Sequence, residues 1–158
     1  MSRPTYNFQR QVPGNLGETT ATVQIGPIGG ANNIGGASPL TANSTTTFHL
    51  PPIGRRAIFR RLIASTVTVP ADADGTILAR AMRYNASTDS ATAVSADLDL
   101  EALVTREATA ALQLSSATDA TLIFGASDTV AINVVNNSAA IDTQPDNLNF
   151  TVEFILLD

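Results

Sequence analysis

The sequence predicts an all-β protein: an antiparallel β-sandwich of jelly-roll type, preceded by an extended N-terminal arm. Two observations support this fold class. Apolar and polar residues alternate along several segments after residue 45, and no segment shows the strand–helix alternation of a parallel α/β sheet. A third observation sets the boundary, because seven of the ten glycines lie between Gly14 and Gly36. We therefore place an arm at residues 1–44 and the sandwich domain at residues 45–158.

The predicted arm is rich in Gly, Asn, Pro, Thr and Gln. It contains a repeated tetrapeptide, because residues 28–31 and 34–37 are both Ile-Gly-Gly-Ala. Ordering so many glycines costs much backbone entropy and buries few side chains. A flexible tail is one interpretation. We favour the other, an arm that becomes ordered against another subunit. Six apolar residues would dock it: Tyr6, Phe8, Val12, Leu16, Val23 and Ile25.

The first strands of the sandwich follow the arm. Residues 44–50 are rich in Thr and end at a pair of prolines, which stops a strand. Residues 57–69 are apolar and β-branched and end at Pro70. The following Asp74-Gly75 pair predicts a hairpin turn, with residues 76–84 as the returning strand.

The middle of the chain contains one clear strand and one ambiguous segment. Residues 85–92 are polar and are expected to form a loop. Residues 94–100 alternate strictly between apolar and polar side chains, as in a half-buried strand. Residues 100–114 fit both a helical stripe and a strand. The flanking strands and the many threonines lead us to favour the strand, with a bulge allowed.

The last two elements show the clearest alternation. Val130, Ile132 and Val134 form one apolar row, and residues 148–156 carry a second row of alternating apolar side chains. The connection between them, residues 136–147, is too long for a tight hairpin. It predicts a crossover between two sheets, as in a Greek key or jelly roll. The chain thus holds about seven or eight strands at the spacing of a sandwich.

The composition excludes several kinds of chemistry. The chain has no Cys and one histidine, His49, so the usual zinc ligand sets and a nucleophilic triad are not expected. No glycine-rich phosphate motif occurs, and a net charge of −5 argues against nucleic-acid binding. The N-terminal residues lack the apolar segment of a signal peptide, and no run of about 18 apolar residues exists to span a membrane. We expect no catalytic residue, no metal and no cofactor.

One basic cluster stands out, formed by Arg55, Arg56, Arg60 and Arg61. On a regular strand, Arg60 and Arg61 would point to opposite faces of the sheet. Two hypotheses are open at this point. The arginines form ion pairs with acidic groups of a partner subunit, or they form ordinary cross-strand pairs within the domain.

The C-terminal part of the chain resembles a known family. Residues 128–138 (Asp-Thr-Val-Ala-Ile-Asn-Val-Val-Asn-Asn-Ser), residues 140–145 (Ala-Ile-Asp-Thr-Gln-Pro) and the final strand are similar to small head proteins of tailed bacteriophages. In that family a β-sandwich decorates, or cements, the capsid, often as a trimer between capsomers. The resemblance implies two partners, the major capsid protein and further copies of the chain in a homotrimer. It also implies synthesis in the host cytoplasm and a final location on the outer capsid surface, and it brings no active-site residues.

The leading hypothesis is therefore a viral structural protein that stabilises an icosahedral capsid from outside. The alternative is a carbohydrate- or receptor-binding jelly-roll module of a phage head or tail fibre. Such modules usually offer an exposed aromatic platform, whereas this chain has no Trp and two tyrosines, Tyr6 and Tyr84. An enzyme would require a pocket that gathers His49 with several carboxylates.

Overall fold

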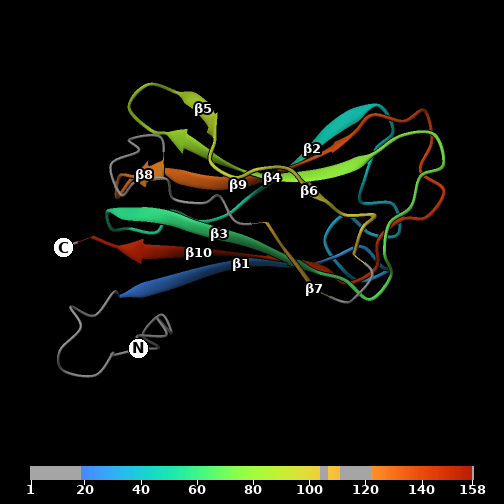
Figure 1. Cartoon of the computed structure of the whole chain (residues 1–158), viewed down its shortest axis with the longest axis horizontal. Helices are drawn as coiled ribbons and strands as arrows, with labels where there is room; N and C mark the ends of the chain where they lie inside the picture. Colours follow the sequence, from blue (N-terminus) through green and yellow to red (C-terminus); the bar gives the residue numbers. More distant parts are fainter. Residues whose placement is uncertain (1–18, 104–106, 111–121, 158) are drawn as a thin grey trace.

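The computed structural model describes residues 19–103, 107–110 and 122–157, which form two antiparallel sheets packed face to face (Figure 1). Sheet 1 contains β1 (Thr20–Ile28), β10 (Leu148–Leu156), β3 (Ala57–Ser65) and β7 (Glu107–Ala110) in that order, with β8 (Ile123–Phe124) also paired to β3. Sheet 2 contains β2 (Ser44–His49), β9 (Thr129–Asn136), β4 (Ile77–Asn85) and β5 (Ser90–Ala93), with β6 (Leu98–Asp99) also paired to β4. The predicted all-β sandwich is confirmed.

The order of the strands is that of a jelly roll. The first strand pairs with the last, β1 with β10, and the second pairs with the one before the last, β2 with β9. Nearer the middle of the chain, β3 pairs with β7 and β8, and β4 pairs with β5 and β6. The connection from β9 to β10 crosses from sheet 2 to sheet 1, as the length of residues 136–147 predicts.

The core lies between the sheets and consists of the alternating rows that the sequence contains. Phe154 of β10 is fully buried and meets two other rings edge to face, Phe59 at 6.2 Å and Phe124 at 5.1 Å between ring centroids. From sheet 2, Val130, Ile132 and Val134 are all buried. Edge-to-face aromatic pairs stabilise a core beyond the area they bury, so these rings fix the packing of β10 against β3 and β8.

The start of the sandwich differs from the prediction. Residues 20–28, assigned to the arm, form β1, an outer strand of sheet 1 that pairs with β10 from Thr20 opposite Ile155 to Ile25 opposite Phe150. This strand has its own alternation, with Ala21 buried and Val23 and Ile25 half-buried on the inner face. The glycines that follow masked this short pattern. The sandwich therefore starts at residue 20, and residues 1–18 of the predicted arm lie outside the described residues.

Residues 29–43, also assigned to the arm, pack against the end of the sandwich where loops 66–76 and 137–147 gather, on the right of Figure 1. Leu40 is 3% exposed, and its backbone exchanges two hydrogen bonds with the Gln144 side chain, at 3.2 and 3.0 Å. Buried backbone groups need such partners. The glycine-rich segment is thus held by the domain that follows it.

The predicted hairpin at Asp74-Gly75 is wrong, because β3 and β4 belong to different sheets. A local turn is present, since Asp72 Oδ1 accepts the Asp74 amide at 3.0 Å. However, β3 ends at Ser65, four residues before the predicted end. There the Thr66 hydroxyl donates to the carbonyls of Thr68 (2.7 Å) and Asp146 (2.9 Å) and so ties the chain to the loop before β10. Residues 66–76 form a crossover between the sheets.

Three further expectations concern residues 85–114. The predicted polar loop at 85–92 contains the start of β5. Within 94–100, Val94, Leu98 and Leu100 are buried as expected, although ladder pairing is confined to β6. In the ambiguous segment, residues 107–110 form strand β7 and pair with β3, as we favoured, whereas 104–106 and 111–121 lie outside the described residues. In the part of the chain that the structure describes, no helix is long and apolar enough to cross a membrane.

Candidate functional site

A β-bulge in β3 shapes the outer face of sheet 1. Along β3 and β10 the inner pairs are Leu62 with Val152 and Phe59 with Phe154, and the register shifts between them. Two residues of β3, Arg60 and Arg61, therefore stand where β10 has one, Glu153. A bulge of this kind adds one residue to a strand, so that two consecutive side chains point to the same face of the sheet.

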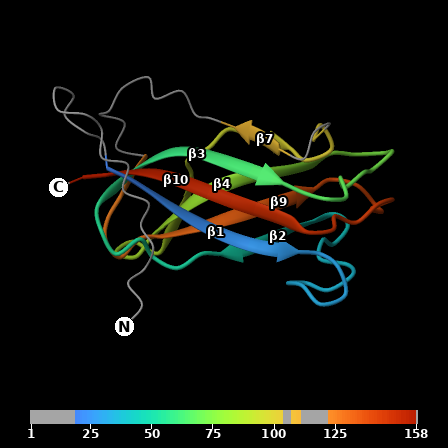
Figure 2. The same cartoon turned by 90° about the horizontal axis from the view of Figure 1, so that it is seen from below.

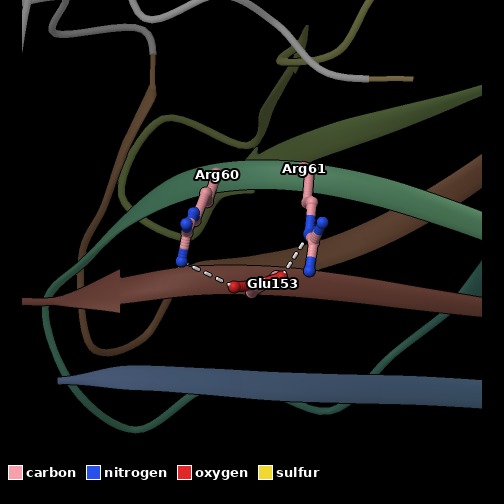
Figure 3. Close-up of polar contacts among 3 residues, drawn as sticks. All are labelled: Arg60, Arg61 and Glu153. Atoms are coloured by element: carbon pink, nitrogen blue, oxygen red, sulfur yellow. Dashed lines mark hydrogen bonds and ion pairs between the residues drawn. The ribbon is translucent and has the colours of Figure 1, made fainter. Parts of the chain in front are cut away.

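Both arginines bind the same carboxylate (Figure 3). Arg60 Nη1 donates to Glu153 Oε1 at 2.8 Å, and Arg61 Nε donates to Oε2. The Glu153 side chain is 10% exposed, whereas each arginine side chain is 43% exposed. The three charges sum to +1, so the trio presents a positive surface whose carboxylate is largely covered.

The structure thus gives an answer for two of the four predicted arginines. Arg60 and Arg61 pair across strands within the domain, which was one of the two hypotheses. The expectation that they point to opposite faces is wrong, because the bulge adds one residue between Phe59 and Leu62. Each guanidinium has five N–H donors, and the half-exposed ones can contact a further molecule.

Arg55 and Arg56 lie a few residues before this pair along the chain. Both are exposed, in the turn just before β3. The Arg56 carbonyl accepts the amide of Leu157 at 2.9 Å, which fixes the turn beside the end of β10. We call Arg55, Arg56, Arg60 and Arg61 together the arginine face. It is a local positive region on a chain whose net charge is −5.

The two arginines of β4 have different roles. Arg80 of sheet 2 forms an ion pair with Asp97, in which Nη2 donates to Oδ2 at 3.0 Å and Nε lies 2.8 Å from Oδ1. Arg83 stands opposite the buried Val130 and donates from Nη1 to the carbonyl of Ile123 in sheet 1. Arg83 therefore links the two sheets, while Arg80 stabilises a surface turn.

The structure places His49 on the surface. It is exposed at the end of β2, and its ring lies 5.4 Å from that of Tyr84 with a tilt of 60°. A tilted pair does not provide the flat platform on which a sugar ring stacks. Among the residues described, no group of three His, Asp or Glu side chains is placed to hold a metal ion.

A shallow depression of about 200 Å³ lies where β2 starts and β9 ends. Its lining is Asn43, Ser44, Thr45, Val135, Asn136 and Asn137. Asn136 is 2% exposed and its Oδ1 accepts the Ser138 amide at 2.9 Å. The lining offers amides and hydroxyls and no charged group, so this depression gives little basis for binding a charged ligand.

The most distinctive surface is the side of the sandwich where the outermost strand of each sheet lies, β1 in sheet 1 and β2 in sheet 2 (Figure 2). Neither strand contains an Asp, Glu, Lys or Arg. Natural proteins usually protect an outermost strand with charges, because its free backbone groups attract other strands. An uncharged edge nine residues long is therefore a candidate site for a neighbouring chain.

The hydrogen-bond phase of β1 shows which groups are free. The Leu156 amide donates to the Thr19 carbonyl at 2.7 Å, which makes Thr20 and Ile155 a non-hydrogen-bonded pair. The backbones of Ala21, Val23 and Ile25 thus bond to β10. Those of Thr20, Thr22 and Gln24 point away from β10. We call this row the open edge of β1.

The predicted docking residues divide into two groups. Val23 and Ile25 are part of β1 and pack against the core of their own domain. The other four, Tyr6, Phe8, Val12 and Leu16, lie outside the described residues. A further feature of the sequence points to the open edge, namely a long segment without charged residues. Residues 19–54 carry no Asp, Glu, Lys or Arg.

Comparison with protein-family models, with curated proteins and with solved structures gives no match to this chain.

Proposed function

We propose that this chain is a capsid decoration protein, which binds the outer surface of an icosahedral viral capsid as a trimer and stabilises it without catalysing a reaction. The observation that carries the proposal is the uncharged open side of the sandwich. A sheet edge without a partner strand promotes aggregation unless a neighbour covers it. A closed ring of copies would cover it in every subunit.

The surface chemistry supports a role in assembly. Charged residues make up 15% of the chain, against about 25% in an average globular protein. The charges that do occur are unevenly placed, with four arginines on the arginine face. Such a face suits an acidic surface on a partner, and the major capsid protein is the partner we propose.

Co-sedimentation tests the proposal. The full-length chain is mixed with empty capsids assembled from the major capsid protein of the same genome, and the pellet is analysed for both proteins. We expect saturable binding that weakens when Arg55 and Arg56 are both changed to Glu. Light scattering should give the mass of three chains of 16.4 kDa each. A chain that stays in the supernatant at all concentrations would refute the proposal.

The same preparation tests the alternative. A carbohydrate-binding module should bind on a glycan array without any affinity for capsids, and the loss of that binding in His49→Ala or Tyr84→Ala would locate the site. The two rings are tilted by 60° and so do not form one continuous flat surface.

A further inference from the structure

We propose that Arg60 and Arg61, held in place by Glu153, form a binding site for a carboxylate side chain on the surface of a partner protein. We call these three residues the arginine–glutamate trio. The inference rests on the proposed function, in which the partner is the major capsid protein. It names the residues that touch this partner and the chemical group that they recognise.

The trio leaves most of its hydrogen-bond donors free. Glu153 accepts from Nη1 of Arg60 at 2.8 Å and from Nε of Arg61. Each guanidinium has five N–H donors, and in the part of the chain that the structure describes neither one has a second partner. Arg61 therefore keeps both of its Nη groups, and Arg60 keeps its Nε and Nη2 groups. Each of these side chains is 43% exposed, so a ligand can approach it from solvent.

Glu153 positions the two guanidiniums before a partner binds. Its side chain is 10% exposed and pairs with both arginines at once (Figure 3). An arginine that is already held loses less side-chain entropy on binding than one that moves freely. Arg55 and Arg56 provide the contrast, because no ion pair or hydrogen bond holds either side chain within the described ranges.

The surroundings of the trio favour a protein as the partner. Ile155 and Thr151 follow and precede Glu153 by two residues on β10, so both share its face of the sheet, and Ile63 stands opposite Thr151 on β3. All three side chains are half-buried and uncharged. Arginine among apolar side chains is typical of interfaces between proteins. A nucleic acid is bound by a larger basic surface that follows its phosphates.

The charge of the trio suits a single carboxylate. Two arginines and one glutamate sum to +1, so one further carboxylate would give two positive and two negative groups. A charge that becomes covered in an interface needs such a partner. The planar fork of a guanidinium also matches the two oxygens of a carboxylate. The trio is therefore complementary to an Asp or Glu side chain on the partner.

Two double variants that conserve charge test the site. Arg60→Lys with Arg61→Lys keeps both positive charges but removes the planar forks. Arg55→Lys with Arg56→Lys makes the same change at two exposed arginines and is the matched control. In capsid co-sedimentation we expect the first variant to bind about tenfold more weakly than the parent chain. The control should stay within about twofold. Equal affinity of the first variant and the parent chain would overturn the inference.

Glu153→Gln tests the positioning role, because charge and position predict opposite results. The substitution removes one negative charge, so a site that acts through charge alone would bind an acidic surface more tightly. We expect binding that is about threefold weaker or more, since the guanidiniums are no longer held. Circular dichroism at the assay temperature shows that the variant is folded. Unchanged or tighter binding by the folded variant would overturn the role of Glu153.

A probe without capsids separates this inference from the proposed function. A capped hexaglutamate peptide carries the same chemical group, and NMR follows its binding through the Nε–H signals of the arginines. We expect the signals of Arg60 and Arg61 to shift, and that of Arg80, which is paired with Asp97, to stay. These shifts without capsid binding would refute the decoration function alone.

The remaining outcomes overturn the carboxylate site. Capsid binding that the lysine changes at residues 60 and 61 leave unaltered would refute the site alone and keep the decoration function. A duplex DNA oligonucleotide that shifts the same two signals at lower concentration than the peptide would show that phosphate, and not carboxylate, is the preferred ligand.

Discussion

Arg60 lies 2.8 Å from Glu153, although the strand register places Arg61 opposite that carboxylate. The contact exists because one extra residue in β3 turns two consecutive side chains to the same face. Glu153 is consequently shared by two guanidiniums and covered by them. The outer face of sheet 1 is thus tied together by one nearly buried anion.

Replacing this anion should destabilise the domain. We expect Glu153→Gln to lower the free energy of unfolding by about 1–2 kcal/mol, because the amide keeps one acceptor oxygen but loses the negative charge and the second acceptor, while both arginines stay partly solvated. Arg60→Gln should cost less, because Arg61 still pairs with the carboxylate. Urea unfolding followed by circular dichroism measures both values. Equal stability of Glu153→Gln and the parent chain would show that the shared carboxylate contributes nothing.

The bulge itself gives a second prediction. Deleting Arg60 leaves Phe59 and Leu62 on the inner face with Arg61 between them, so the alternation of β3 becomes regular. We expect the chain that lacks Arg60 to fold, with an unfolding free energy at most about 2 kcal/mol lower than that of the parent chain. Deleting Ile63 instead places Ala64 and the residues after it on the wrong face.

The expected contrast is therefore a folded protein without Arg60 and an insoluble or unfolded one without Ile63. Expression level, circular dichroism and a cooperative melt distinguish the two. If both deletions fold equally well, the register between β3 and β10 is not fixed by the inner row.

The strands that the sequence predicts best are those in which apolar and polar side chains alternate without interruption. In β2, β9 and β10 each residue contributes to one face, so period two is visible without knowledge of the partner strand. The segment Phe59-Arg60-Arg61-Leu62 breaks that period, and a bulge is defined only by the opposite strand. The same limit applies to the Asp74-Gly75 turn, because the local residues favour a turn in a hairpin and in a crossover alike.

The candidate surface was predictable only in part. The four clustered arginines are evident in the sequence. However, Glu153, the partner of Arg60 and Arg61, lies over 90 residues away along the chain and is adjacent only through the pairing of β3 with β10. Val23 and Ile25 were predicted to contact a partner subunit, and the structure packs both against the core of their own domain. The lack of charge over residues 19–54 was the local signal for an open edge.

Truncation gives a third prediction, which concerns where the folded domain starts. Removing residues 1–18 leaves every core residue of the described sandwich in place, so the unfolding free energy should stay within about 0.5 kcal/mol. Removing residues 1–28 also deletes β1, which exposes one edge of β10 and removes Ala21 and Ile28 from the core. We expect that shorter chain to be largely unfolded.

Circular dichroism and thermal melting of the two truncated chains provide the measurement. The result also decides which truncation is suitable for capsid-binding experiments. A chain lacking residues 1–44 also lacks β1, so it should not fold, and its failure to bind capsids would say nothing about the arm. A cooperative melt of the chain lacking residues 1–28 would contradict the assignment of β1 to the sandwich.

A fourth prediction concerns two glycines in the loop after β1, both of which adopt positive φ. Gly29 has φ of +83°, and an added Cβ would lie 2.0 Å from the Pro145 carbonyl oxygen. Gly36 has φ of +62°, and an added Cβ would meet nothing within 4 Å. The left-handed conformation costs a residue with a side chain about 1–2 kcal/mol. Gly36→Ala should therefore lower the unfolding free energy by about 1 kcal/mol.

Gly29→Ala adds a collision with backbone, which no side-chain rotation relieves. We expect it to cost about 3 kcal/mol or more, as for other severe backbone substitutions. The loss should be centred on the loop end of the sandwich, because Gly29 accepts from Asn33 Nδ2 at 2.8 Å and packs on the connection that leads into β10. Urea unfolding of both variants measures the difference, and hydrogen exchange at Asn147 and Asn149 locates it. Similar costs for the two substitutions would mean that the loop moves away from Pro145 without penalty, and that residues 29–43 are not an integral part of the domain.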